Sequence, residues 1–380
     1  MGTVNKTIVD DIPPSHSQAL KDEIMTLKKE LRDAYREEIQ TDEVRRVIFK
    51  IANSKRKDVS WLGHGKVDNF LGGIPTLFAS DWHWGETVNP SEVQGINAYN
   101  LSIARDRVRN LFARFIDIYI NQFKFNSYSG CVLVLGGDML SGDIHDELKE
   151  TNGEEVLPCV ISLTDELCSG IKLLKKAFGK VGIFAVTGNH GRTGKKPRFK
   201  RRAYTNYDWL IYTSCEKMFD DDPDVMFNIP TGPDCLFKIY STRYLLTHGD
   251  NLGRGGDGLI GMIGPVTRGD IKRRTRQMLM HDPYDVMLCG HFHQLAMLRS
   301  RIVNGALKGY DEFAHGLGFA PEPPLQASWI TNPSVGITLQ VPIPCEGENE
   351  KYDGGSWLSW KIQNQNQDQN KKQNQKTSRK

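Results

Sequence analysis

The sequence predicts an α/β fold between Leu71 and Cys345. In this region five short apolar runs have the length of strands, and longer amphipathic stretches separate them. Alternation of this kind is typical of a sheet whose faces are covered by helices. The chain has 380 residues, and its hydrophobic content of 39% and charged content of 25% are close to the globular norm. A substantial buried core is therefore expected.

The two ends of the chain differ in composition from this region. From Ser15 to Ile39 apolar residues recur every three or four positions, which predicts an amphipathic helix. We expect residues 1–55 to form a helical arm ahead of a main domain at 56–350. The arm can pack on that domain, pair with a second copy of the chain as a homo-oligomer, or contact DNA. Residues 351–380 are rich in Gln, Asn, Lys and Ser, which predicts a disordered tail.

Strands are expected at the apolar runs of the main domain and helices at the amphipathic stretches. In chain order, the strand candidates are Thr76–Ser80, Cys131–Leu135, Val181–Thr187, Tyr244–Thr247 and Asp285–Cys289. The helix candidates are residues 94–122, 158–179, 204–219 and 268–281. The segment 300–345 is expected to complete the sheets. A Gly-rich stretch from Leu252 to Gly264 can form a lid over a crevice or an ordinary loop.

Cysteine usage and hydropathy indicate the compartment. The seven cysteines form no CxxC pair, and several lie in apolar runs, so we expect buried thiols in a reducing environment. No apolar stretch reaches the ~20 residues that a membrane helix needs, and no signal peptide opens the sequence. These features predict a cytoplasmic protein without a membrane partner. The net charge of +3 is too small to indicate a polyanionic partner by itself.

Each of the five strand candidates ends in a polar cluster. Ligands bind at the carboxyl ends of strands in open α/β sheets, so these clusters are expected to face one crevice. Imidazole, carboxylate and amide ligands indicate Mn, Fe or Zn. They are less typical of a thiolate metal site or of a magnesium site with oxygen ligands only. One such cluster alone is usually a turn, but five in order predict a metal site. The clusters are Asp81-Trp82-His83, Gly136-Gly137-Asp138, Gly188-Asn189-His190, His248-Gly249-Asp250 and Gly290-His291-Phe292-His293.

The spacing within the clusters supports shared metal ions. In an extended chain Asp81 and His83 lie on the same side, so one ion can take both side chains. In the same way, His291 and His293 can turn two imidazoles toward two adjacent ions. Glycines that precede three of the expected ligands allow sharp turns and leave room near the ions.

This order of motifs (DxH, GGD, GNH, HGD and GHxH) resembles the calcineurin-like metallophosphoesterase family over residues 74–294. The resemblance implies a four-layer α/β/β/α sandwich with two mixed sheets. It also implies a metal-dependent phosphoric ester hydrolase. The segment from Asn304 to Phe313 resembles a stretch of phage-encoded members, which would place the protein in a host cytoplasm. The resemblance to SbcD-type nucleases is confined to the metal motifs.

Residue by residue, the resemblance implies a centre of two divalent ions (Mn, Fe or Zn, with Mn favoured). His190 would protonate the leaving alkoxide, and Asp250 would be a partner of a metal-bound histidine. Gly191 stands where many members carry an acidic residue, so Asp143 or Asp146 could orient His190 instead. The metal ligands would be Asp81, His83 and His293 for one ion, and Asn189, His248 and His291 for the other, with Asp138 bridging both.

Basic residues beside these motifs favour a nucleic acid substrate. The expected substrate-binding residues are Arg192, Arg198, Lys200, Arg201 and Arg202. Tyr204, Tyr207 and Trp209 follow them, and a second basic cluster spans Arg268 to Arg276. Cations interleaved with aromatic rings suit a phosphate backbone with stacked bases. The hypothesis is therefore hydrolysis of phosphodiester bonds in DNA or RNA.

Three alternatives stay open. The substrate can be a small nucleotide or a phosphoprotein, because the metal motifs indicate only a phosphoester. The chain can also be a non-catalytic interaction module that retains the fold. The basic runs can be no more than solvated surface, which is what charge runs usually are.

Overall fold

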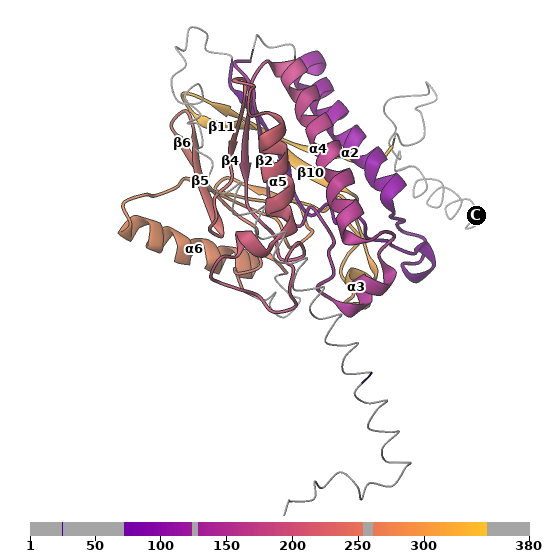
Figure 1. The fold of residues 1–380 in the computed structure, drawn as a ribbon. Coiled ribbons are helices and arrows are strands. Elements are labelled where there is room, and N and C mark those ends of the chain that lie inside the picture. Colours follow the sequence, from indigo (N-terminus) through magenta and orange to yellow (C-terminus); the bar gives the residue numbers. More distant parts are fainter. Residues whose placement is uncertain (1–24, 26–71, 124–127, 254–260, 348–380) are drawn as a thin grey trace, which may run out of the picture. The chain divides into compact units, whose positions relative to one another are not determined.

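The computed structural model describes residue 25 and residues 72–123, 128–253 and 261–347 (Figure 1). The predicted tail, the predicted arm apart from residue 25, and the middle of the Gly-rich stretch lie outside these residues. The arm, its pairing with a second copy and the lid therefore stay predictions.

The first sheet has six strands in the spatial order β11-β10-β1-β2-β3-β4. Its parallel strands are β1 (Ile74–Ala79), β2 (Cys131–Leu135), β3 (Val181–Ala185) and β4 (Val225–Asn228). The antiparallel strands β10 (Leu325–Asn332) and β11 (Gly336–Pro344) extend it beyond β1. All residues of β1, β2 and β3 are buried, as expected for parallel strands covered on both faces.

The second sheet has five strands in the order β5-β6-β7-β9-β8. Parallel pairs join β6 (Thr242–Thr247), β7 (Val286–Cys289) and β9 (Arg301–Val303). The edge strands β5 (Asp234–Ile239) and β8 (Ala296–Leu298) are antiparallel to their neighbours. Both sheets are therefore mixed.

Within the described ranges, four longer helices form the outer layers. In Figure 1, α2 (Leu101–Ile116), α4 (Val156–Phe178) and α5 (Tyr207–Met218) lie on one side of the first sheet, and their buried residues share its core. α6 (Ile263–Leu279) packs on the second sheet through Val266. The shorter helices are η2 (Pro90–Glu92), η3 (Asp117–Gln122), α3 (Asp146–Thr151), η4 (Ala203–Thr205) and α7 (Glu312–Gly316).

The two sheets face each other across a second core. Phe184 on β3 stacks on Phe237 of β5 at 4.1 Å between ring centroids, and Phe237 stacks on Tyr244 of β6 at 5.1 Å. Along β1, Leu77 packs toward the helices and Phe78 toward the other sheet, following the alternation of a strand. The predicted four-layer α/β/β/α sandwich with two mixed sheets is thus confirmed.

The predicted elements are found with shifted ends. The helix expected at 94–122 begins at Leu101, because the side chain of Asn100 accepts the amide of Ile103 at 3.0 Å and caps it there. The segment 300–345 completes both sheets, as predicted, through β9, β10 and β11. All seven cysteines lie in the described ranges, where they are buried and form no disulfide. In the described part of the chain, no helix has both the length and the hydropathy of a membrane span.

Candidate metal centre

The five polar clusters follow β1, β2, β3, β6 and β7, and hydrogen bonds tie their backbones together. The amide of Asp81 donates to the carbonyl of Gly137 at 3.0 Å, and that of Gly290 to the carbonyl of His248 at 2.8 Å. The two sheets are joined here because the amide of His291 donates to the Asp81 carboxylate at 2.9 Å. The clusters therefore meet at one edge of the sandwich.

One group of donor atoms comes from Asp81, His83 and His293, which offer atoms within 4.8 Å of one another. The Nε2 atoms of His83 and His293 are 3.0 Å apart. Oδ1 of Asp81 lies 3.5 Å from His293 Nε2. These are the three residues that the resemblance assigns to one ion.

A second group comes from Asp138, His248 and His291, again with donor atoms within 4.8 Å. His248 Nε2 lies 3.0 Å from Asp138 Oδ2 and 3.0 Å from the side-chain oxygen of Asn189. Asp138 also forms a group with His190 and a histidine of the first group. The structure thus brings the predicted ligands together and places Asp138 between the two groups.

This donor set fits divalent metal ions. Ligands bound to one ion at about 2.0–2.2 Å lie roughly 3–4 Å apart. The separations of 3.0 and 3.5 Å in the first group match this range. Asp81 and His83 are fully buried, and Asp138 and His248 are 1% exposed, so the floor of the site excludes water. Buried carboxylates of this kind are normally paired or bound to cations.

Unusual backbone conformations are concentrated at the same residues. Nine non-glycine residues of the described chain have a positive φ, and five of these are expected ligands. Their φ values lie between 48° and 71°, a region that most side chains rarely adopt. Such conformations cost about 1–3 kcal/mol each and cluster at functional sites. The five are Asp81, His83, Asp138, His291 and His293.

Two glycines allow the loops of the site to approach one another. A Cβ atom at Gly188 would lie 2.0 Å from Asp138 Oδ1, and one at Gly290 would lie 2.2 Å from Asp81 Oδ2. Both distances are far below van der Waals contact. The prediction that glycines leave room beside the ligands is confirmed.

Burial and mutual attraction set the charges of the site. Burial disfavours charge on His248, but the Asp138 and Asp81 carboxylates outweigh it and raise the pKa of His248 to about 10. Burial dominates at His190 and His291 and lowers their pKa values to about 3 and about 4. Burial also raises the pKa of Asp81 to about 6. Neutral imidazole is the form that binds metal ions, so burial favours the ligand form at His291, whereas a metal ion bound at His248 would have to displace its proton.

The histidines are oriented from behind by fixed partners. His248 Nδ1 donates to the carbonyl oxygen of Gly136 at 2.9 Å, which turns Nε2 toward the site. His83 Nδ1 lies 3.0 Å from the carboxylate of Glu86, and Glu86 contacts the ammonium of Lys308 at 2.7 Å. Burial disfavours the charge on Glu86, but Lys308 and His83 hold the pKa of its carboxyl well below its usual range.

Neither Glu86 nor Lys308 was predicted to belong to the site. Both are buried, and their side chains come from positions 222 residues apart in the sequence. The available signal for Glu86 was its place three residues after His83 in the same loop. Lys308 lies in the segment Asn304–Phe313, which contains none of the five metal motifs.

Asp208, at the start of α5, was also missed. Its Oδ2 accepts the amides of Asp138 at 3.0 Å and Gly188 at 2.9 Å, and its Oδ1 accepts the amide of Met139 at 3.2 Å. Burial raises the pKa of this carboxyl to about 6. In the sequence Asp208 is an ordinary acidic residue in the first turn of a helix. Its role in fixing two ligand loops depends on the fold.

His190 lies beside the two donor groups. Its amide donates to Asp138 Oδ1 at 2.6 Å, and its Nδ1 donates to the carbonyl of Ser141 at 3.1 Å. A backbone carbonyl therefore orients this imidazole, and not Asp143 or Asp146 as the sequence suggested. Asp146 instead forms an ion pair with Lys195.

Steric crowding explains why residue 191 is glycine and not the acidic residue that many family members carry after the histidine of the GNH motif. A Cβ atom at this position would lie 2.6 Å from Oδ1 of Asn206 and 3.0 Å from Cγ of Asp208. Because Asn206 is tied to the carbonyl of Gly188 at 2.8 Å, it has little freedom to move. An acidic side chain after His190 therefore does not fit here.

Asp250 forms an ion pair with Arg202, and its predicted role as a partner of a metal-bound histidine stays a prediction. The Arg202 guanidinium donates to both carboxylate oxygens, at 2.8 and 3.0 Å, and to the carbonyl of Thr187 at 3.1 Å. This pair ties the loop after β6 to the loop after β3.

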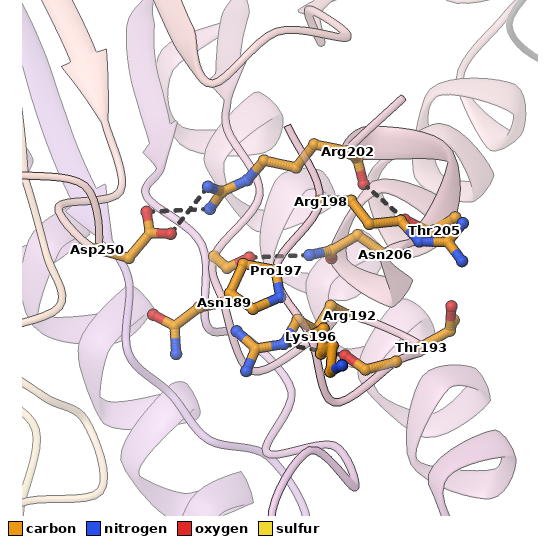
Figure 2. Close-up of a pocket in the computed structure, with 12 residues that line it drawn as sticks. Asn189, Arg192, Thr193, Lys196, Pro197, Arg198, Arg202, Thr205, Asn206 and Asp250 are labelled. Atoms are coloured by element: carbon orange, nitrogen blue, oxygen red, sulfur yellow. Dashed lines mark hydrogen bonds and ion pairs between the residues drawn. The ribbon is translucent and has the colours of Figure 1, made fainter. Parts of the chain in front are cut away.

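Residues 192–202, here called the basic loop, form a cavity beside Asn189 (Figure 2). The cavity has a volume of about 120 Å³. Lys200 and Arg201, which were also expected to bind substrate, are exposed and do not line it. The charged residues in its lining are Arg192, Lys196, Arg198, Arg202 and Asp250.

The second basic cluster forms ion pairs within the protein. On α6, Arg274 contacts Asp270 at 3.0 Å. Arg273 and Arg276 contact Asp234 at 3.6 and 2.5 Å. These three arginines are neutralised within the protein, Arg274 by a carboxylate of its own helix and the other two by Asp234 of β5, so their charges are already paired.

The aromatic residues after the basic loop are not free for stacking either. Trp209 is fully buried, and Tyr204 packs against its ring edge-on at 5.3 Å. Tyr207 is partly buried, which raises the pKa of its hydroxyl. The exposed ring of this region is that of Phe199, which is 96% accessible.

No protein-family model and no curated protein matches the sequence. Among solved structures, the chain is similar to vacuolar protein sorting 29 from Cryptosporidium parvum, with 13% identity, a TM-score of 0.29, and coverage of 72% of this chain and 98% of that one. A protein described as a predicted phosphoesterase from Streptococcus pneumoniae matches with 11% identity, a TM-score of 0.26, and coverage of 71% and 97%. A dimetal phosphatase from Danio rerio matches with 10% identity, a TM-score of 0.32, and coverage of 72% and 99%. At these TM-scores, the function has to be inferred from the site's own geometry.

Proposed function

We propose that this protein is a two-metal phosphoesterase that hydrolyses phosphodiester bonds. The supporting observation is the pair of adjacent donor groups with Asp138 between them. When bound, two divalent ions would supply positive charge that offsets the charge on the attacking and leaving oxygens. The donors suit Mn, Fe and Zn, and manganese is the first of these ions to test. The residues that would hold the ions are Asp81, His83, Asp138, Asn189, His248, His291 and His293.

His190 would assist the transfer of the phosphoryl group. Its Nδ1 is engaged by Ser141, so Nε2 is the atom that can meet a substrate. Burial lowers its pKa to about 3, which keeps the imidazole neutral until an anionic phosphate approaches. The negative charge of the phosphate raises that pKa. A protonated Nε2 can then donate its proton to the leaving oxygen.

A nucleic acid is the proposed substrate class. The basic loop places cations next to Asn189, and a phosphate backbone is a natural partner for them. The exposed ring of Phe199 in the same loop can stack on a base. A small nucleotide is the second candidate, because the cavity admits a single phosphate group. The phage origin and the cytoplasmic location stay predictions.

Hydrolysis by metal-stripped protein reconstituted with Mn²⁺ tests this function. The substrates are bis-p-nitrophenyl phosphate, labelled single- and double-stranded DNA, and RNA. We expect cleavage of the chromogenic diester and of at least one polymer. Asp138→Ala should lower both activities at least a thousandfold, because it removes the shared carboxylate. Glu147→Ala is the matched control, since it removes an exposed carboxylate of the segment after β2 that belongs to neither donor group.

The outcomes separate the candidate functions. Cleavage of the diester alone would favour a small nucleotide over a polymer. Hydrolysis of none of these substrates with Mn, Fe or Zn would contradict the proposal and favour a non-catalytic module.

A further inference from the structure

The cavity beside Asn189 shares a wall with the metal centre. Gly188 and Asn189 line it (Figure 2). The side-chain oxygen of Asn189 also lies 3.0 Å from His248 Nε2. The volume of about 120 Å³ is large compared with the roughly 10–15 Å³ that one water requires. A phosphate-sized group can therefore occupy it while another group occupies the metal centre.

Positive charge dominates the lining. Four cationic side chains face one carboxylate, that of Asp250. Arg202 is already paired with Asp250 through two hydrogen bonds. Lys196 and Arg198 are exposed and form no ion pair or hydrogen bond with any residue of the described ranges. Their charges are thus available to an anion that enters the cavity.

Arg192 is fixed in place by its own loop. Its Nε donates to the carbonyl of Gly194 at 3.0 Å, and its Nη2 donates to the carbonyl of Lys195 at 3.0 Å. Figure 2 shows its guanidinium on the side of Asn189. Partial burial lowers the pKa of Arg192, and the nearby carboxylates of Asp138 and Asp250 oppose this effect. A fixed guanidinium near both the cavity and the metal centre is well placed to hold a phosphate oxygen.

We propose that this cavity binds a second phosphate group of the substrate, next to the phosphate that is hydrolysed. The inference rests on the proposed function and narrows its substrate class. The preferred substrate carries another phosphate one linkage away from the scissile bond, as internal bonds of DNA and RNA do. Lys196 and Arg198 supply the unpaired charge, and Arg192 supplies the fixed donor. A dinucleoside monophosphate would leave the cavity empty.

Binding to metal-free protein tests the cavity without hydrolysis. The probes are thymidine dinucleotides with an uncharged methylphosphonate linkage, carrying a phosphate at the 5′ end, at the 3′ end or at neither end. Because the linkage is neutral, any gain in affinity comes from the terminal phosphate. By isothermal titration calorimetry we expect one phosphorylated probe to bind at least about tenfold more tightly than the unphosphorylated probe. The double variant Lys196→Gln/Arg198→Gln should lose this gain.

Lys200→Gln is the matched control, because it removes an exposed cation of the same loop that does not line the cavity. It should keep the gain. No gain from a phosphate at either end, or an equal loss in the control and the double variant, would overturn the assignment of the cavity.

A kinetic comparison separates this inference from the proposed function. With Mn²⁺-loaded protein and natural dinucleotides, a terminal phosphate should raise kcat/KM about tenfold or more in the wild type and not in the double variant. If the binding gain is found but neither the dinucleotides nor the diester, DNA or RNA is hydrolysed, the assignment of the cavity stands and the proposed function fails. If hydrolysis occurs but a terminal phosphate changes neither kcat/KM nor affinity, the proposed function stands and the assignment of the cavity fails.

Discussion

Two buried carboxylates hold the ligands of the candidate metal centre from behind. Glu86 contacts Nδ1 of His83, and Asp208 accepts three backbone amides around Asp138 and Gly188. Partners of this kind fix which nitrogen of a histidine faces an ion and are part of a metal site's design. They are also the residues that sequence motifs did not reveal.

Glu86→Gln tests this arrangement at the residue scale. The amide has the size of the carboxylate but lacks its charge, so His83 is held less firmly. We expect the affinity for Mn²⁺, measured by calorimetric titration, to fall about 10–100-fold. Asp311→Asn is the matched control, because Asp311 is the other carboxylate on Lys308 and does not contact His83. It should lower stability while leaving Mn²⁺ affinity near the wild-type value. Equal losses of affinity in the two variants would contradict the role given to Glu86.

At the scale of elements, the central strands were predictable and the edge strands were not. β1, β2 and β3 are buried along their whole length, so each stands out in the sequence as a continuous apolar run. β4 and β5 alternate between buried and more exposed residues, so neither stands out in the sequence as a continuous apolar run. The expected ligands were predictable because they follow the strongest strands.

The charged segments show why the rest of the site could not be read from the sequence. The arginines of α6 looked like a phosphate-binding surface, yet Arg273 and Arg276 pair with Asp234, 39 and 42 residues away. Arg202 likewise pairs with Asp250, which follows a strand of the other sheet. Whether a cation is free depends on partners that only the fold brings together.

The loop after β3 makes a prediction at the same scale. Gly191→Asp restores the residue type that many family members carry, yet its Cβ atom would lie 2.6 Å from Asn206 Oδ1. We expect this variant to lose about 1–3 kcal/mol of unfolding free energy in urea, as overpacked sites do. Gly194→Asp is the control, since a Cβ atom there meets nothing within 4 Å. An unchanged stability of Gly191→Asp would show that the loop has room after all.

At the scale of the whole molecule, the candidate metal centre lies where the two sheets meet. The amide of His291 on the second sheet donates to the carboxylate of Asp81 on the first. The expected ligands of each ion come from both sheets, so bound ions would link the two halves of the sandwich. The buried carboxylates and strained ligand loops would then be stabilised together.

Metal binding should therefore stabilise the entire domain. A ligand present at 100 times its Kd adds about 2.7 kcal/mol per site to the free energy of unfolding. We expect Mn²⁺ to raise the Tm of the metal-stripped protein by several degrees in differential scanning calorimetry. Asp138→Ala should show little of this rise, because it removes the shared ligand. A rise of equal size in Asp138→Ala would place the ions elsewhere.

The central claim is that the strand-end clusters form one hydrolytic centre for two metal ions. The most direct test is to titrate Mn²⁺ into the metal-stripped protein while following hydrolysis of bis-p-nitrophenyl phosphate. We predict that the rate rises with added metal and reaches its plateau at two equivalents per chain. No hydrolysis at any ratio, or a plateau at one equivalent, would contradict the account.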